Sequence, residues 1–183
     1  MAPPVRKKED CAALWKGLAT GSIDVVATDH CSFNFADKLA LGKEDFSKCP
    51  GGIPGVETRL PLIFSEGVLK GKISLNRFVE VVSTNPARIM GLYPRKGSLA
   101  EGSDGDVVLF DPERERIVTP AALHNNADYS PYEGMRVRGW PVTTLVRGRI
   151  VMQQDQLLVE KGWGEYVPRH PIPDAASTKE IIK

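Results

Sequence analysis

Apolar residues recur at helical spacing in the first half of the chain. In "CAALWKGLATG", Leu14, Trp15 and Leu18 share one face, and Gly21 stands where a helix of that length can end. The apolar segment "LIFSEGVLKG" follows a stretch rich in glycine and proline. This order predicts a loop that leads into a second helix.

Two further helices are predicted beyond that loop. Ser74 can cap the first of them, whose apolar face consists of Leu75, Phe78, Val79 and Val82. In "STNPARIMGLYP", Thr84 or Asn85 can cap the next helix, and Pro86 suits its first turn because the first helical N–H groups need no partner within the helix. Gly91 can close that helix.

Strand signals dominate after about residue 93, whereas we expect helices over most of residues 55–92. The run "GDVVLFDP" is apolar between turn residues, and "VTTLVRGRIVM" contains two β-rich runs that meet at Gly148. We expect strands over most of residues 104–152. One earlier strand is predicted at about 23–28, where "IDVVA" is apolar and β-branched.

These patterns indicate an α/β protein in three parts. Residues 1–93 form a helical part with one strand, residues 94–164 form a β part, and residues 165–183 form a proline-rich extended arm that wraps a neighbour or stays mobile.

Composition and charge narrow the class of protein. The 183 residues are 42% apolar and 26% charged, which is typical of a globular chain. The formal net charge of +1 argues against nucleic acid or a membrane surface as the main partner and favours a small molecule or a protein. The sequence has no apolar run of about 20 residues and no secretory signal at its start, so we expect a cytoplasmic protein.

Metal ligands and thiols are sparse. Cys11, Cys31 and Cys49 form neither a disulfide framework nor a C-x-x-C pair, so we expect reduced thiols. The three histidines, His30, His124 and His170, are too far apart in the sequence for an H-x-H or H-E-x-x-H pair. A self-contained metal centre is therefore not expected.

Asp29 is the first candidate for chemistry. It follows the apolar run in "VVATDHCSFNF". In a β/α barrel, residues at that end of a strand face the active site, where a carboxylate can bind a metal or accept a proton. The alternative is that Asp29 caps a turn, and His30 beside it is typical of a hydrogen-bonded structural histidine.

The loop "CPGGIPG" is the second candidate. Its main-chain groups can hold a ligand, although a surface loop is the simpler reading.

Several motifs together resemble one known family. They are "PPVR", "LWKGLATG", "TDHCSFNF", "KLALGKEDFSKCPGGIPGVETRL", "SLNRFVEVVSTNPARIMGLYPRKGSLAEGSDGDVVLFDP" and "YSPYEGMRVRGWP". From Pro3 to about Pro171 the chain is similar to the C-terminal part of dihydropyrimidinases and D-hydantoinases, the cyclic amidohydrolases. The resemblance implies the last strand and following helices of an amidohydrolase TIM-type barrel, together with part of a small β-sandwich.

The resemblance also implies a reaction and site residues. Family members use two metal ions, usually zinc, to open the ring amide of dihydropyrimidines or hydantoins. By motif, Asp29 is a metal ligand and the proton shuttle of the reaction. Gly51 lies in the loop whose main chain holds the ring amide of the substrate, at a position where the family often has Asn or Glu.

The family's other metal ligands lie upstream of "PPVR". They are an H-x-H pair, a carbamylated lysine and two further histidines. We therefore expect a fragment, or a subunit that docks on a separate chain, with no activity in isolation. The alternative is a binding or assembly module like the non-catalytic dihydropyrimidinase-related proteins. The residues leave open whether dihydropyrimidines or hydantoins are preferred.

The family forms dimers and tetramers, so the complete protein is expected to be a homo-oligomer. We expect the isolated chain to self-associate as well. An unpaired strand at 23–28 and uncovered apolar helix faces at 60–68 and 78–82 would favour association.

Overall fold

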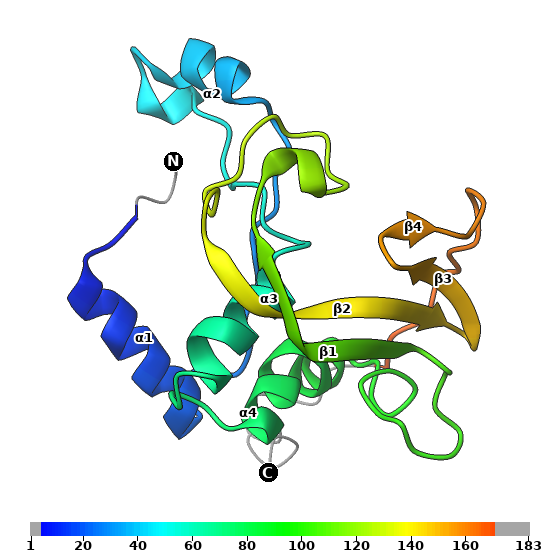
Figure 1. Cartoon of the computed structure of the whole chain (residues 1–183). Coiled ribbons are helices and arrows are strands. Elements are labelled where there is room, and N and C mark those ends of the chain that lie inside the picture. Colours follow the sequence, from blue (N-terminus) through cyan, green and yellow to red (C-terminus); the bar gives the residue numbers. More distant parts are fainter. Residues whose placement is uncertain (1–4, 171–183) are drawn as a thin grey trace.

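The helices lie in the first half of the chain and an antiparallel sheet lies in the second (Figure 1). The structure, a computed structural model, describes residues 5–170. The α-helices are α1 (Lys8–Thr20), α2 (Phe35–Gly42), α3 (Arg59–Ile63), α4 (Leu75–Val79) and α5 (Asn85–Ile89). Short 3₁₀ turns are η1 (Phe46–Lys48) and η4 (Pro120–Ala122), and π-helical turns are η2 (Phe64–Val68) and η3 (Glu80–Thr84). The mixed α/β class, with helices before the sheet, agrees with the sequence.

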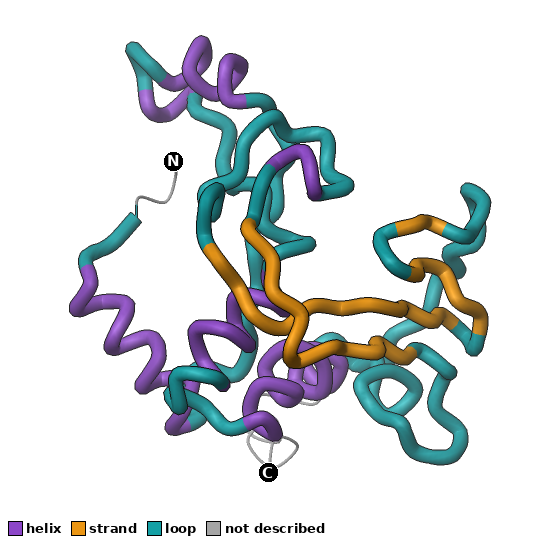
Figure 2. The backbone as a smooth tube through the Cα atoms, viewed as in Figure 1, coloured by secondary structure: helices purple, strands orange, loops and turns teal. Residues whose placement is uncertain are grey.

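The sheet contains four antiparallel strands in the order β1-β2-β3-β4. They are β1 (Val107–Ile117), β2 (Arg136–Val146), β3 (Arg149–Gln153) and β4 (Gln156–Leu157). Arg147 and Gly148 form the turn between β2 and β3, with φ of 49° and 76°. Positive φ at both positions matches the twist of a tight hairpin, so the predicted junction at Gly148 is confirmed. A long connection over residues 118–135, which includes the short turn η4, separates β1 from β2 (Figure 2).

Two helix boundaries follow the local sequence signals. Gly21 adopts φ 78° just after α1 and donates its N–H to the carbonyl of Gly17, which is the left-handed ending expected of glycine. The Ser74 side chain accepts a hydrogen bond from the N–H of Arg77 at 3.1 Å and so caps α4.

The predicted boundary at Thr84 and Asn85 is wrong, because the helix continues from Leu75 to Ile89. Thr84 and Asn85 both have right-handed helical dihedrals, and the N–H of Asn85 reaches back to the carbonyl of Glu80. Pro86 has no N–H to continue the regular α-helical ladder, and the wider π turn η3 lies directly before it. Proline is thus accommodated inside the helix rather than at its start.

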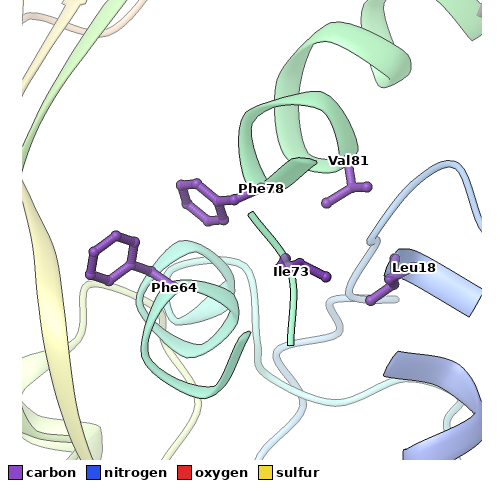
Figure 3. Packing of buried hydrophobic residues seen from close by; sticks show 5 residues of the cluster. All are labelled: Leu18, Phe64, Ile73, Phe78 and Val81. Atoms are coloured by element: carbon purple, nitrogen blue, oxygen red, sulfur yellow. The ribbon is translucent and has the colours of Figure 1, made fainter. Parts of the chain in front are cut away.

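One apolar core joins the helices. Its buried members are Leu18, Phe64, Ile73, Phe78 and Val81 (Figure 3). They come from α1, η2, the turn before α4, α4 and η3, and full burial of each large side chain contributes about 1.5–3 kcal/mol. Phe110 of β1 packs on the same cluster, with its ring centroid 4.9 Å from that of Phe64. The apolar helix faces at 60–68 and 78–82, which the sequence predicts to be uncovered, are therefore largely buried within the chain.

A second core fixes the sheet against α3. Leu62 packs with Val118, Val137 and Trp140, all of them buried. Gly139 of β2 allows this approach, since a Cβ atom there would lie 2.3 Å from the Phe64 ring. The division at residues 93 and 164 stays a prediction, and both cores combine side chains from the two sides of residue 93.

The strand expected at about 23–28 is wrong as stated. Within the described residues, this segment has no neighbouring strand, and the one ladder contact is a parallel bridge between His30 and Ile53. Side chains from the helices hold its carbonyl groups instead. Arg77 donates to the carbonyl of Ile23 at 2.7 Å, Asn85 to that of Asp24 at 3.0 Å and Arg59 to that of Val26 at 2.9 Å.

The proposed C-terminal arm falls mostly outside the described residues. Residues 165–170 have neither helix nor strand, and the N–H of His170 donates to the carbonyl of Gly91 at 2.9 Å.

Candidate functional site

Asp29 stands at the end of the 23–28 segment, where the chain meets the loop "CPGGIPG". Its φ is 48°, a left-handed conformation that is uncommon for residues other than glycine. Its carbonyl accepts the N–H of Ile53 at 3.2 Å, and the N–H of Cys31 donates to the carbonyl of Ile53 at 3.1 Å. These two bonds fix the backbone on both sides of His30, while the Asp29 side chain is exposed.

Gly51 lies close to this contact. Its neighbour Gly52 is buried with φ 73°, and a Cβ atom at Gly52 would lie 2.2 Å from the carbonyl oxygen of Asp29. Only glycine permits such an approach. The structure therefore brings the two predicted site residues together, with Asp29 packed against the residue that follows Gly51, and Gly51 itself is exposed.

His30 fastens the far end of the same loop. Its Nδ1 atom accepts hydrogen bonds from the N–H groups of Gly55 at 3.1 Å and Val56 at 3.3 Å. An acceptor at Nδ1 requires the neutral ring form in which that nitrogen carries no proton. The prediction of a hydrogen-bonded structural histidine is confirmed.

Lys38 of α2 fastens the near end of the loop. Its side chain is buried, with 8% of the residue exposed. Its Nζ atom donates to the carbonyls of Pro50 at 2.7 Å and Gly52 at 2.6 Å. No pattern in the sequence predicts this contact, because "DKLAL" resembles any helix with one outward lysine.

Hydrogen bonds of His124 connect Glu57, which follows the loop "CPGGIPG", to the turn between β3 and β4 of the sheet. The main-chain N–H of His124 donates to the Glu57 carboxylate at 2.7 Å, and its Nδ1 lies 2.8 Å from the other carboxylate oxygen. Its Nε2 lies 2.9 Å from the carbonyl oxygen of Asp155, between β3 and β4. Hydrogen bonding to Glu57, with a smaller contribution from Asp155, raises the pKa of His124 above its usual value. The pKa of Asp155 is lowered, chiefly by its hydrogen bond from Arg116.

The described residues do not by themselves fit a zinc centre. Zinc takes about four nitrogen, sulfur or oxygen ligands, and its catalytic sites keep three from the protein. Across residues 5–170, no group of three His, Cys, Asp or Glu side chains is placed to share an ion. Nδ1 of His30 accepts hydrogen bonds from the loop and is not free to bind a metal. Asp29 is then the one carboxylate ligand that the motif "TDHC" offers.

No helix within the described part of the chain is long and apolar enough to cross a membrane.

The extended segment 23–28 thus ends at the exposed Asp29, whose main chain is held against a glycine-rich loop that leads into α3. A sequence model of the Amidohydrolase family matches residues 5–151, and the chain belongs to this family. The D-phenylhydantoinase of Escherichia coli O1:K1 / APEC is 49% identical over 171 residues, which are 93% of this chain and 37% of that protein.

Solved structures give the same assignment. The dihydropyrimidinase of Brevibacillus agri NCHU1002 is 46% identical with a TM-score of 0.88, over 91% of this chain and 36% of that one. The D-hydantoinase (dihydropyrimidinase) of Thermus sp. is 43% identical with a TM-score of 0.89, over 94% and 37% of the two chains. The resemblance noted from the sequence is confirmed, and the chain spans about 37% of the length of the curated relatives it matches.

Proposed function

We propose that this chain is the C-terminal portion of a metal-dependent cyclic amidohydrolase, which hydrolyses the ring amide of dihydropyrimidines or hydantoins and is inactive as an isolated chain. The observation that carries the proposal is the contact between Asp29 and the loop that contains Gly51. The main-chain carbonyl of Asp29 makes this contact, and both Asp29 and Gly51 are exposed. This supports a site in which a carboxylate and free main-chain groups act on an amide substrate and its attacking water.

Each residue has a defined role in this proposal. The main chain at Gly51 binds the ring amide, and glycine leaves that position without a side chain. The oxygen of the attacking water bonds to the ring carbonyl carbon while Asp29 accepts one of its protons, and Asp29 returns this proton to the ring nitrogen as the carbon–nitrogen bond breaks. The products are a ureido group and a carboxylic acid, which releases the second proton of the water to solvent and becomes a carboxylate. By resemblance, two zinc ions belong to the complete family site, and Asp29 would be this chain's ligand to them.

The experiment joins the upstream part of the E. coli D-phenylhydantoinase to this chain at the start of the matched region. The chimaera should open hydantoin or dihydrouracil, with the loss of ultraviolet absorbance as the readout. The chain alone with added zinc should show no turnover, because one carboxylate does not hold two metals. Comparison of the two substrates gives the preference that the sequence leaves open.

Asp29→Asn should lower the kcat of the chimaera by about 10²-fold or more, as expected for loss of a positioned proton carrier. Asp37→Asn is the matched control, since Asp37 is an exposed acid in the first turn of α2. An active chimaera whose rate is unchanged by Asp29→Asn would contradict the role given to Asp29.

The second candidate is a non-catalytic binding or assembly module. Residues 5–170 bring no complete metal donor set together, which limits what this chain can do alone under either candidate. An inactive chimaera that folds, binds zinc and forms the dimers or tetramers of its relatives would support this candidate against the first.

A further inference from the structure

We infer that Lys38 is a positioning residue that sets the direction of the main-chain groups of Gly51 and so determines how tightly this loop binds a ring amide. The inference rests on the proposed function for the role of Gly51, but the geometry of Lys38 stands without it. Its Nζ atom donates to the carbonyls of the two residues that flank Gly51, Pro50 at 2.7 Å and Gly52 at 2.6 Å.

Because the peptide bond is planar, the contact of Lys38 with the carbonyl of Pro50 also fixes the direction of the N–H of Gly51. In a trans peptide the C=O and the following N–H point in opposite directions. The one cis bond within residues 5–170 is Tyr93–Pro94, so the Pro50–Gly51 bond is trans. Because Lys38 draws the carbonyl of Pro50 toward α2, the N–H of Gly51 points away from α2.

The contact of Lys38 with the carbonyl of Gly52 orients the Gly52–Ile53 peptide plane by the same geometry. The carbonyl of Gly52 points to Lys38, and the N–H of Ile53 in that peptide donates to the carbonyl of Asp29. Gly51 thus lies between two peptide planes that a single ammonium group orients. This matters most for glycine, whose backbone otherwise loses the most conformational freedom when it becomes ordered.

Helix α2, which carries Lys38, has tertiary contacts at both of its ends. The N–H of Phe35 at the start of α2 donates to Asp128 at 2.8 Å, and the Phe35 ring packs edge-on against Tyr129 at 5.7 Å. At the other end of α2, a Cβ atom on Gly42 would lie 2.6 Å from that of Cys49, so helix and loop are in close contact. Within residues 5–170 no carboxylate forms an ion pair with Lys38, so the two carbonyls are its polar partners.

The test uses three variants. Lys38→Met keeps the length of the side chain and removes the donors, whereas Lys38→Arg keeps a cation that can donate to both carbonyls. Lys43→Met is the matched control, because Lys43 is an exposed lysine at the end of the same helix.

The first readout is the carbonyl carbon resonances of Pro50 and Gly52 in the labelled chain. Loss of the ammonium hydrogen bonds in Lys38→Met should move both signals upfield and speed amide exchange at Gly51, and Lys38→Arg should restore part of each change. The signals of buried Gly139 should stay unchanged, which excludes general unfolding. Unchanged Pro50 and Gly52 signals in Lys38→Met would overturn the inference.

The second readout is catalysis by the chimaera. Lys38→Met should raise KM about tenfold, the equivalent of one hydrogen bond to the substrate, with a smaller effect on kcat. Lys43→Met should leave both constants unchanged. A wild-type chimaera without activity would contradict the proposed function and leave the carbonyl resonances to decide on Lys38, whereas an active one with unchanged KM in Lys38→Met would overturn the positioning role.

Discussion

His124 joins three segments that are distant in the sequence. Both of its ring nitrogens face oxygen atoms, one of Glu57 and one of Asp155, and only the doubly protonated imidazolium can donate to both. This geometry is the physical reason why the pKa of His124 is raised. Protonation of a single side chain therefore strengthens the link between the loop before α3 and the turn after β3.

The sign of the pH effect follows from the raised pKa. The unfolded chain has the ordinary histidine pKa of 6.5, so the stabilisation is fully present below that pH and is lost as the pH rises through the folded value. The His124 side chain is 43% exposed, and solvent screening limits the contribution to about 1 kcal/mol or less.

We expect His124→Gln to lower the free energy of unfolding more at pH 5.5 than at pH 8.5, as measured by urea denaturation. In a Glu57→Gln background the same substitution should show a smaller dependence on pH. Equal losses at both pH values in the wild-type background would contradict the assignment of a charged pair.

At the scale of elements, side-chain donors replace a missing strand partner. Segment 23–28 keeps its position because Arg59, Arg77 and Asn85 of the helical elements bind its carbonyls. Carbonyl groups that lose access to water need partners, and these side chains supply them to the partly buried carbonyls of segment 23–28, where no neighbouring strand is described. The helical run from Leu75 to Ile89, together with Arg59 of α3, therefore holds the segment that leads to Asp29.

The N-terminal cap of this helical run offers a direct test. Ser74→Ala should lower the free energy of unfolding by about 1 kcal/mol, because the N–H of Arg77 loses its acceptor. Ser83→Ala on the same run is the control, as Ser83 is exposed and lies inside the helix. Thermal unfolding of both variants measures the difference, and equal stability of the two would show that the cap contributes nothing.

For the whole molecule, the exposed apolar surface lies elsewhere than the sequence indicated. Phe64, Phe78 and Val81 are buried, whereas large apolar residues on α2 and in η1 face solvent. The most exposed of these are Phe46 at 82% and Phe35 at 57%. Figure 1 shows α2 well separated from the sheet and from α4, so the elements of the main core do not cover it.

Exposed apolar side chains of this size favour association. We expect the isolated chain to sediment as an oligomer at micromolar concentration, and Phe46→Ser to shift it toward the monomer. Mixing with the upstream part of a relative should have the same effect if that part covers α2. A compact monomer of 20.1 kDa for the wild-type chain would contradict this expectation.

Local rules alone determined several features of this protein. Gly21 ends α1, Ser74 caps α4 and Gly148 closes the β2–β3 hairpin, because each depends on the dihedrals or hydrogen bonds of a few consecutive residues. The motif around Asp29 and the loop with Gly51 were also readable, since their order along the chain carries the family resemblance.

Only the tertiary structure decided the contacts made across long stretches of chain. Lys38 reaches the loop 12 and 14 residues away, and His124 reaches Glu57 across 67. Periodicity identifies which face of a helix is apolar, but it carries no information on which carbonyl a polar side chain will meet. The same reason explains the missing strand at 23–28, because an extended segment becomes a strand only when a neighbour supplies the hydrogen bonds.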